Sequence, residues 1–342
     1  MFVSDQSGFE CALARGRLTD EVAVVSVGVE VRYGIEPSGL RIMGPPRARR
    51  ATDPPDIRRV VLWRGTSVTA AGTVAGPGKA PFVRPVSLAV NGTEVRVVVL
   101  GPRRWQQVRG RLVPSEPERF DAVPLDWAGA FGGTYEIPPG LDEATGLPHP
   151  GGSVAYVYNP SGVGFYPDEE AAAGQPLPSL EDPTALIREW SDRPRPVGLS
   201  PCPGMPAMRM EDFEPAAAAS GDGEAAPVPP ALVERCGPGL LRTAARMQHH
   251  APGSLIFPWL EPRTAVRATG FAAADLLAAC PAPPVTVASR RGRSADELRG
   301  RVQSVHLDVD ARDVLVSFGF AVRYAPSAPP QWIDVRRVEK AQ

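Results

Sequence analysis

The chain has 342 residues, enough for one large domain or two ordinary ones, and 43% of them are hydrophobic, which allows a substantial core. The formal net charge of −1 gives no overall field that would favour nucleic acid or an anionic membrane as a partner. With 40 prolines and 34 glycines, the chain is predicted to be rich in turns and loops, with few long helices.

The first third of the sequence has the pattern of β-strands, with runs of β-branched residues separated by glycine, proline and asparagine. Asn91-Gly92 stands between two apolar runs. This is the strongest short signal for a β-hairpin, because both residues tolerate positive φ in a type I′ turn. The strands predicted here are residues 21–33, 59–68, 83–90 and 93–100, with a further strand opening at Arg104-Trp105.

Turns dominate residues 112–182, where proline, glycine and asparagine clusters interrupt every longer periodic pattern. One strand is expected within this region, at residues 153–158. The Asp-Pro-Thr triplet at 182–184 has the residue types of a helix start, which predicts a short helix through Trp190. Residues 214–230, rich in alanine, proline and glycine, are predicted to form a mobile loop.

The last third returns to β-structure after one predicted helix, residues 239–250, whose apolar residues recur near helical spacing. Val305, Leu307 and Val309 alternate with polar residues, which is the pattern of a half-buried strand. Residues 308–313 have the composition of a second hairpin turn. The strands predicted here are residues 254–260, 264–271, 285–289, 302–309 and 314–324.

Strands at both ends of the chain, few helices and no regular strand–helix alternation predict a mainly β protein. We expect packed antiparallel sheets joined by long Pro/Gly-rich loops and a few short helices. Residues 1–342 are interpreted as a single domain, with a division into two lobes as an alternative. In that case an N-terminal β lobe covers residues 1–213, residues 214–230 are a linker or loop, and residues 231–342 form a C-terminal β lobe with one helix.

Two blocks of the sequence are the most informative: PLDWAGAFGGTY at residues 124–135 and YNPSGVGF at residues 158–165. They combine aromatic residues, glycines and an Asn-Pro turn with almost no group for proton or nucleophile chemistry, which favours a binding module or a packed, turn-rich centre. Capping a turn is the favoured role of Asp126, with pairing to an arginine or lining a pocket as alternatives. The candidate signature or partner-binding residues are Arg104, Trp105, Pro124, Leu125, Asp126, Trp127, Phe131, Gly132, Gly133, Tyr135, Asn159, Pro160, Gly162, Gly164 and Phe165.

The residue types that bind metals do not gather into a known pattern. The four histidines form no HExxH-like cluster, and His249-His250 suit the end of the predicted helix better than a metal site. The four cysteines form no close pair, which argues against zinc. With no apparent signal peptide, they favour reduced thiols and a cytoplasmic location. Cys202 is interpreted as a small buried or loop thiol rather than a nucleophile.

Phosphate-binding glycine motifs and the GxSxG motif are absent from the sequence. No apolar run approaches the ~20 residues that cross a bilayer. We therefore expect no catalytic residue, no cofactor or metal, no nucleic-acid partner and no membrane insertion.

Several segments, in the same order and at similar spacing, resemble the motifs of a bacterial family known as domain of unknown function 2169. Residues 124–133 are similar to its PLxWxxAFGG motif, and residues 159–165 to its NPxGxG[FY] motif. After Pro201 the sequence departs from the family pattern, with Cys202-Pro203 in place of a segment containing tryptophan and arginine. The resembling segments are residues 59–66, 76–79, 86–90, 100–105, 124–133, 159–165, 177–181 and 195–201.

The resemblance implies a function, because members of this family linked to type VI secretion act as effector adaptors or chaperones. A non-enzymatic cytoplasmic protein is therefore expected. It would hold a toxin effector, or the VgrG-like or PAAR-like spike protein that carries the effector, until loading onto a type VI or related contractile secretion system. Edge strands of a β-rich body suit this role, because they can pair with an incoming segment.

Two other functions stay open at this point. One is a β-rich hydrolase or carbohydrate-active protein that uses Asp126 with Glu136, Glu169 or Glu181, since paired carboxylates at a suitable separation cleave glycosidic bonds. The other is a structural component of an injection machine.

Overall fold

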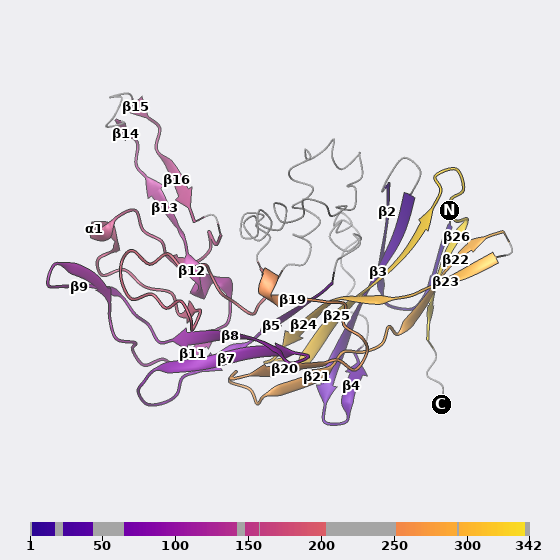
Figure 1. Ribbon diagram of the computed structural model, residues 1–342, viewed down its shortest axis with the longest axis horizontal. Coiled ribbons are helices and arrows are strands. Elements are labelled where there is room, and N and C mark those ends of the chain that lie inside the picture. Colours follow the sequence, from indigo (N-terminus) through magenta and orange to yellow (C-terminus); the bar gives the residue numbers. More distant parts are fainter. Residues whose placement is uncertain are drawn as a thin grey trace. The chain divides into compact units, whose positions relative to one another are not determined.

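The computed structural model describes residues 2–17, 23–43, 65–141, 148–156, 158–202, 251–292 and 294–338 (Figure 1). The predicted linker 214–230, the predicted helix 239–250 and residues 59–64 of a predicted strand lie outside these ranges. The chain divides into two compact units, each made of separate segments. Unit 1 is Met1–Thr69, Arg209–Val266 and Leu277–Gln342, and unit 2 is Ala70–Met208 and Arg267–Leu276.

The larger sheet of unit 1 joins the beginning and the end of the chain. Its order is β19 (Ile256–Phe257), β5 (Thr66–Ala71), β24 (Arg301–Asp308), β25 (Asp313–Tyr324), β3 (Ala23–Glu36) and β2 (Glu10–Arg17), and β4 (Gly39–Ile42) pairs with β3. The longest pairing is antiparallel, from Asp313 opposite Gly34 to Tyr324 opposite Ala23. Because β3 and β25 belong together, the boundaries of the units differ from those of the predicted lobes 1–213 and 231–342.

Alternation along these strands produces the core of unit 1. Val305, Leu307 and Val309 are buried, as the sequence pattern predicts for a half-buried strand. The predicted second hairpin is confirmed, because β24 and β25 pair in antiparallel fashion up to Asp308 opposite Asp313.

A second sheet of unit 1 contains β1 (Phe2–Gln6), β26 (Trp332–Arg337), β22 (Val285–Arg291) and β23 (Ser294–Leu298), in that order. The pairing of β1 with β26 is parallel, and Phe2 lies opposite Trp332. Sequence reasoning predicts neither of these two strands, because the pairing joins residues at opposite ends of the chain and leaves no local turn signal.

The main sheet of unit 2 has the order β18 (Leu180–Glu181), β8 (Thr93–Leu100), β7 (Val83–Val90), β20 (Ala265–Thr269) and β21 (Leu276–Ala279). The boundaries between the units fall inside β5, β20 and β21. The predicted hairpin of β7 and β8 is confirmed with the predicted bounds. Asn91 and Gly92 have φ values of 48° and 85°, as a type I′ turn requires.

The rest of unit 2 consists of short two-stranded pairings joined by turns. The described residues contain three helical turns. Two are in unit 2, η2 (Trp127–Gly129) and α1 (Glu169–Ala172), and η4 (Gly253–Leu255) is in unit 1. The pairs are β6 (Thr73–Ala75) with β11 (Ala122–Pro124), β9 (Trp105–Val108) with β10 (Arg111–Pro114), β12 (Phe131–Gly132) with β17 (Val163–Gly164), β13 (Thr134–Ile137) with β16 (Gly152–Ala155), and β14 (Gly140–Leu141) with β15 (Pro148–His149).

The mainly β fold class is confirmed, although two of the pairings, β1–β26 and β12–β17, are parallel. The predicted helix from residue 182 to Trp190 is wrong. Asp182 instead closes a turn, in which its side chain accepts a hydrogen bond from the N–H of Thr184 at 2.7 Å. The α-helix lies earlier, at Glu169–Ala172, where the side chain of Asp168 accepts from the N–H of Ala171 and caps the first turn.

Candidate functional site

Asp126 caps the η2 turn, as favoured from the sequence. Its Oδ1 accepts hydrogen bonds from the N–H groups of Ala128 and Gly129, at 3.0 and 3.3 Å. The preceding Leu125 is buried, and the following Trp127 is buried while its indole N–H donates to the carbonyl of Ser200 at 3.1 Å. The Pro-Leu-Asp-Trp run therefore holds the backbone near residue 200 as well as its own turn.

Asn159 ties the two signature blocks together. Its side chain is fully buried, and Nδ2 donates to the carbonyls of Trp127 at 2.7 Å and Phe131 at 3.2 Å. In the other direction, its backbone carbonyl accepts from the N–H of Gly133 at 2.9 Å. Strand β12 also pairs with β17 beside this point, with Phe131 opposite Val163. The Asn-Pro motif therefore works as a set of hydrogen bonds that holds the Trp-x-x-x-Phe-Gly-Gly segment.

Two positions in these blocks require glycine, because neighbouring atoms lie where a Cβ atom would be. A Cβ on Gly132, which has a φ of 150°, would lie 2.0 Å from the carbonyl oxygen of Asn159. A Cβ on Gly162 would lie 2.4 Å from Nδ2 of Asn159 and 2.5 Å from the carbonyl oxygen of Ala130. Both distances are far below van der Waals contact, so no larger residue fits without moving the backbone.

The aromatic residues of the blocks pack on one another and on a hydrophobic cluster. This cluster consists of Trp105, Leu112, Phe131, Ala172, Leu177 and Ile187, with Tyr156, Tyr166 and Trp190 packed against it. Phe131 and Tyr156 meet edge to face at 5.0 Å between ring centroids, and the ring of Phe165 lies tilted at 5.2 Å from that of Tyr156 and 5.5 Å from that of Tyr135. Such contacts stabilise by about 0.5–1.5 kcal/mol each beyond the burial of their area.

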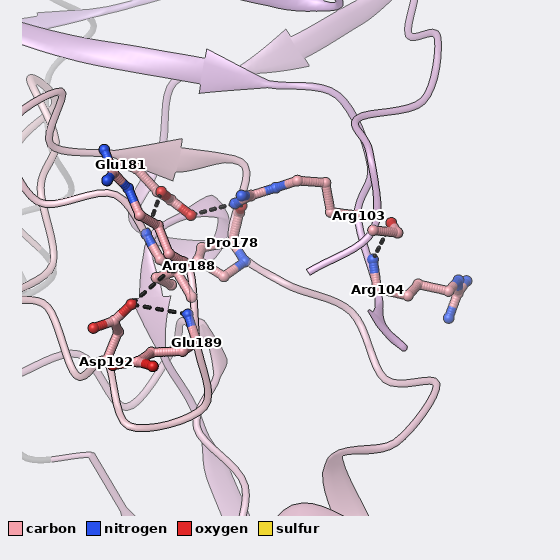
Figure 2. A network of polar contacts seen from close by, with 9 residues as sticks. Arg103, Arg104, Pro178, Glu181, Arg188, Glu189 and Asp192 are labelled. Carbon is pink, nitrogen blue, oxygen red and sulfur yellow. Dashed lines mark hydrogen bonds and ion pairs between the residues drawn. The ribbon is translucent and has the colours of Figure 1, made fainter. Parts of the chain in front are cut away.

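A buried ion pair lies beside this cluster (Figure 2). Nη2 of Arg103 donates to a carboxylate oxygen of Glu181 and to the carbonyl of Pro178, and both charged side chains are at most 5% exposed. The second oxygen of Glu181 accepts from the N–H of Ile187 at 2.9 Å. Burial raises the pKa of Glu181, and the nearby charge of Arg103 offsets part of that effect.

The remaining candidate residues serve the same segment or lie at its surface. Arg104 is exposed and donates to the carbonyl of Gly174 at 3.0 Å. Pro124 is exposed at the end of β11, Pro160 is half-buried and accepts from the hydroxyl of Thr134, and Gly164 is buried in β17. All fifteen candidates therefore lie in unit 2, and most contribute to its packing.

The other groups considered from the sequence are dispersed. Glu169 and Glu170 are exposed and border a depression of about 380 Å³ together with Gln107, Leu112 and Ala173. Within the described ranges, no three His, Cys, Asp or Glu side chains come together as a metal site would need. Among those same residues, no helix has the length and apolar character that crossing a bilayer requires.

The described histidine His306 and the described thiols have the surroundings of structural groups. His306 of β24 is hydrogen-bonded through Nδ1 to the hydroxyl of Thr69 at 3.0 Å, and burial lowers its pKa. The described thiols Cys11, Cys202 and Cys280 form no disulfide, and Cys202 is buried, in line with its interpretation from the sequence. Both histidines 249–250 lie outside the described residues.

Sequence reasoning missed the ion pair of Arg103 and Glu181 and the aromatic rings of Tyr156 and Trp190. The ion pair joins residues 78 positions apart, so no local pattern identifies it. The signal that does exist is position, because Arg103 and Glu181 each stand inside a segment that resembles a family motif.

The comparison with protein-family models agrees with the resemblance. The model of a family described as an uncharacterized protein conserved in bacteria, DUF2169, matches residues 24–318. Comparison with curated proteins and with solved structures gave no match. Because the matched region covers most of the chain and includes both signature blocks, this protein belongs to the bacterial DUF2169 family.

Proposed function

We propose that this protein is a non-enzymatic, cytoplasmic adaptor or chaperone for a contractile secretion system. It binds a toxin effector, or the VgrG-like or PAAR-like spike protein that carries the effector, and assists its loading. Membership of the DUF2169 family supports the proposal, because the resemblance noted in the sequence implies this role for family members linked to type VI secretion. The structural observation that carries it is that polar side chains in and near the two signature blocks bond to the chain itself.

Those polar groups hold loops in place. Asp126 caps η2, Asn159 bridges the two blocks, and Glu181 pairs with Arg103 while accepting from the N–H of Ile187. A surface of loops that is already ordered loses little conformational entropy when a partner binds. Ordered loops of this kind suit a binding module.

The hydrolase alternative fits these surroundings less well. Of the three acids that it pairs with Asp126, Glu136 and Glu169 are exposed, while Glu181 is 2% exposed and both of its oxygens accept hydrogen bonds from the protein. The Oδ1 of Asp126 itself is engaged in capping. A glycosidase needs two carboxylates that face an open cleft at about 5–10 Å from each other.

The experiment starts from the genes beside the one for this chain. The protein is co-expressed with each neighbouring product that carries a toxin or spike domain, and the complex is purified through a tag on the neighbour. We expect stoichiometric co-purification, and loss of export of that toxin in a deletion strain. Normal export by the deletion strain would reject the proposal, and stoichiometric recovery of this protein in purified secretion particles would favour a structural component instead.

A further inference from the structure

Two arginines of unit 2 lie over aromatic rings at the surface. The guanidinium of Arg193 is 4.3 Å from the ring centroid of Trp190, and that of Arg195 is 5.6 Å from the ring centroid of Tyr158. Both arginines are exposed, and Pro194 separates them in sequence. We call Tyr156, Tyr158, Trp190, Arg193 and Arg195 the arginine–aromatic rim.

The aromatic residues of the rim pack on the core of unit 2 and on one another. Trp190 meets the buried Trp105 edge to face at 5.6 Å, and Tyr156 meets Tyr158 at 5.4 Å. The hydroxyl of Tyr156 donates to the carbonyl of Pro194 at 3.4 Å, between the two arginines. The guanidinium planes are therefore held by rings that are themselves packed, so less side-chain entropy is lost when they bind a ligand.

The acids of the same loop accept hydrogen bonds from within the loop. Oδ2 of Asp192 accepts from the N–H groups of Arg188 and Glu189, at 2.8 and 3.0 Å, as Figure 2 shows. Oε1 of Glu189 accepts from the hydroxyl of Ser191 at 2.9 Å. Nη1 of Arg193 donates to the main-chain carbonyls of Trp190 and Asp192. One oxygen of Asp192 and one of Glu189 are thus engaged within the loop, and the side chains of Arg193 and Arg195 are exposed.

We propose that the arginine–aromatic rim is a docking surface for an acidic segment of a partner protein. This inference rests on the proposed function and assigns to it a place on the chain. A guanidinium presents a planar fork of donors that matches a carboxylate, and Arg, Trp and Tyr are the residues enriched where interface binding energy concentrates. The complementary occupant is therefore a segment that places Asp or Glu side chains opposite Arg193 and Arg195.

A nucleic acid is the less suitable occupant. Binding to a phosphate backbone depends on releasing many counterions through an extended basic surface. Here two guanidinium groups stand on one loop and the whole chain has a net charge of −1, so the rim is not an extended basic surface. A carboxylate segment needs only the two fixed guanidinium groups.

The test uses the full chain and a defined probe, an octaglutamate peptide, measured by fluorescence anisotropy at about 50 mM salt, where exposed charges are weakly screened. The test variant is Arg193→Gln with Arg195→Gln. The matched control is Arg111→Gln with Arg119→Gln, which removes the same charge from exposed positions of the same unit. Circular dichroism and thermal unfolding verify that both variants fold.

We expect salt-sensitive binding of octaglutamate by the native protein, about tenfold weaker binding by the rim variant, and a change below about twofold in the control. Equal binding by native protein and rim variant, or no binding by the native protein, would overturn the docking surface. Tighter binding of oligothymidine through the same two arginines would assign the rim to nucleic acid and overturn it too.

The neighbour partner then separates this inference from the proposed function. If the native protein binds octaglutamate through the rim but no neighbouring gene product, the proposed function fails and the carboxylate-binding surface stands. If the neighbour co-purifies equally well with the native protein and the rim variant, the adaptor function stands and the rim is not its docking site.

Discussion

Replacing Asn159 by alanine is the sharpest test of how the signature blocks work. The side chain is 0% exposed, and its Nδ2 donates to the carbonyls of Trp127 and Phe131, with Ala130 more distant at 3.5 Å. The carbonyls of Trp127 and Ala130 each accept a second bond, from the N–H of Ala130 at 3.3 Å and of Val163 at 3.0 Å. In the alanine variant these two carbonyls would each keep one donor, so the energetic cost falls mainly on the carbonyl of Phe131.

The magnitude can be worked out from these contacts. A buried carbonyl left without a donor costs about 1–3 kcal/mol, and the void left by truncating the side chain adds about 1 kcal/mol. We expect Asn159→Ala to lower the free energy of unfolding of unit 2 by about 2–4 kcal/mol, a large share of the roughly 5–15 kcal/mol typical of a native protein.

Asn159→Asp refines the same test through pH. The introduced carboxylate would face the carbonyl oxygens that now accept from Nδ2, so its folded-state pKa would be raised above the unfolded value of about 3.9. A carboxyl with a raised pKa binds more protons in the folded state, so stability falls as pH rises from the unfolded pKa to the folded one. The variant is thus expected to approach native stability near about pH 4 and to lose it toward about pH 7.

Hydrogen–deuterium exchange read by mass spectrometry is the assay, because a chain with two units need not unfold in one step. Peptides covering residues 127–133 and 159–165 report the local opening free energy. If Asn159→Ala changes protection of these peptides by less than about 1 kcal/mol, or if Asn159→Asp shows no dependence on pH, the bridging role assigned to this side chain is wrong.

Three further predictions concern the same unit and the thiols. Gly162→Ala places a Cβ 2.5 Å from the carbonyl oxygen of Ala130 and should lower the melting temperature by several degrees, whereas the control Gly152→Ala, with no atom within 4 Å, should change it little; equal shifts would contradict the close approach. Glu181→Leu should lower the free energy of unfolding by about 3–5 kcal/mol in chemical denaturation, because it leaves the charge of Arg103 buried and unpaired. Adding Arg103→Met should recover much of that loss, and a double variant whose loss equals the sum of the two single losses would exclude this explanation. Burial raises the pKa of Cys280 to about 12. Iodoacetamide at about pH 8 should therefore label this thiol slowly in the native protein and rapidly in urea, as measured by peptide mapping. Fast labelling of the native protein would contradict the burial.

Local chemistry determines the features that could be predicted from the sequence. The Asn91-Gly92 hairpin has its predicted bounds because the turn type and the flanking apolar runs specify it together. Asp126 caps a turn because its side chain reaches two nearby N–H groups. The predicted helix after Asp182 failed because the same Asp-Pro-Thr chemistry also closes a simple turn. Beyond that turn, Ile187 is buried in the core and its N–H donates to Glu181, a long-range packing that no local pattern indicates.

Pairs that are distant in the chain determine the features that could not be predicted. The parallel pairing of β1 with β26 and the ion pair of Arg103 with Glu181 have no sequence pattern of their own. The stacking of Arg193 on Trp190 has the same origin, because Trp190 was predicted to end a helix and is instead half-buried against Trp105. The fold class was therefore accessible from the sequence, while the candidate docking surface required the packing of unit 2.

Mutations in the signature blocks and mutations in the arginine–aromatic rim should have different effects, and the difference distinguishes a role in folding from a role in partner binding. Asn159 and Gly132 lie within the packed centre, so their replacement should lower stability and partner binding together. Arg193 and Arg195 are exposed, so their replacement by glutamine should weaken partner binding with only a small drop in melting temperature, from the loss of the bonds that Arg193 donates to the carbonyls of Trp190 and Asp192. The measurement is a plot of partner affinity against melting temperature for both sets of variants. If the rim variants fall on the line defined by the core variants, the glycine- and aromatic-rich blocks and the rim act through stability alone, and the partner must bind elsewhere on the chain.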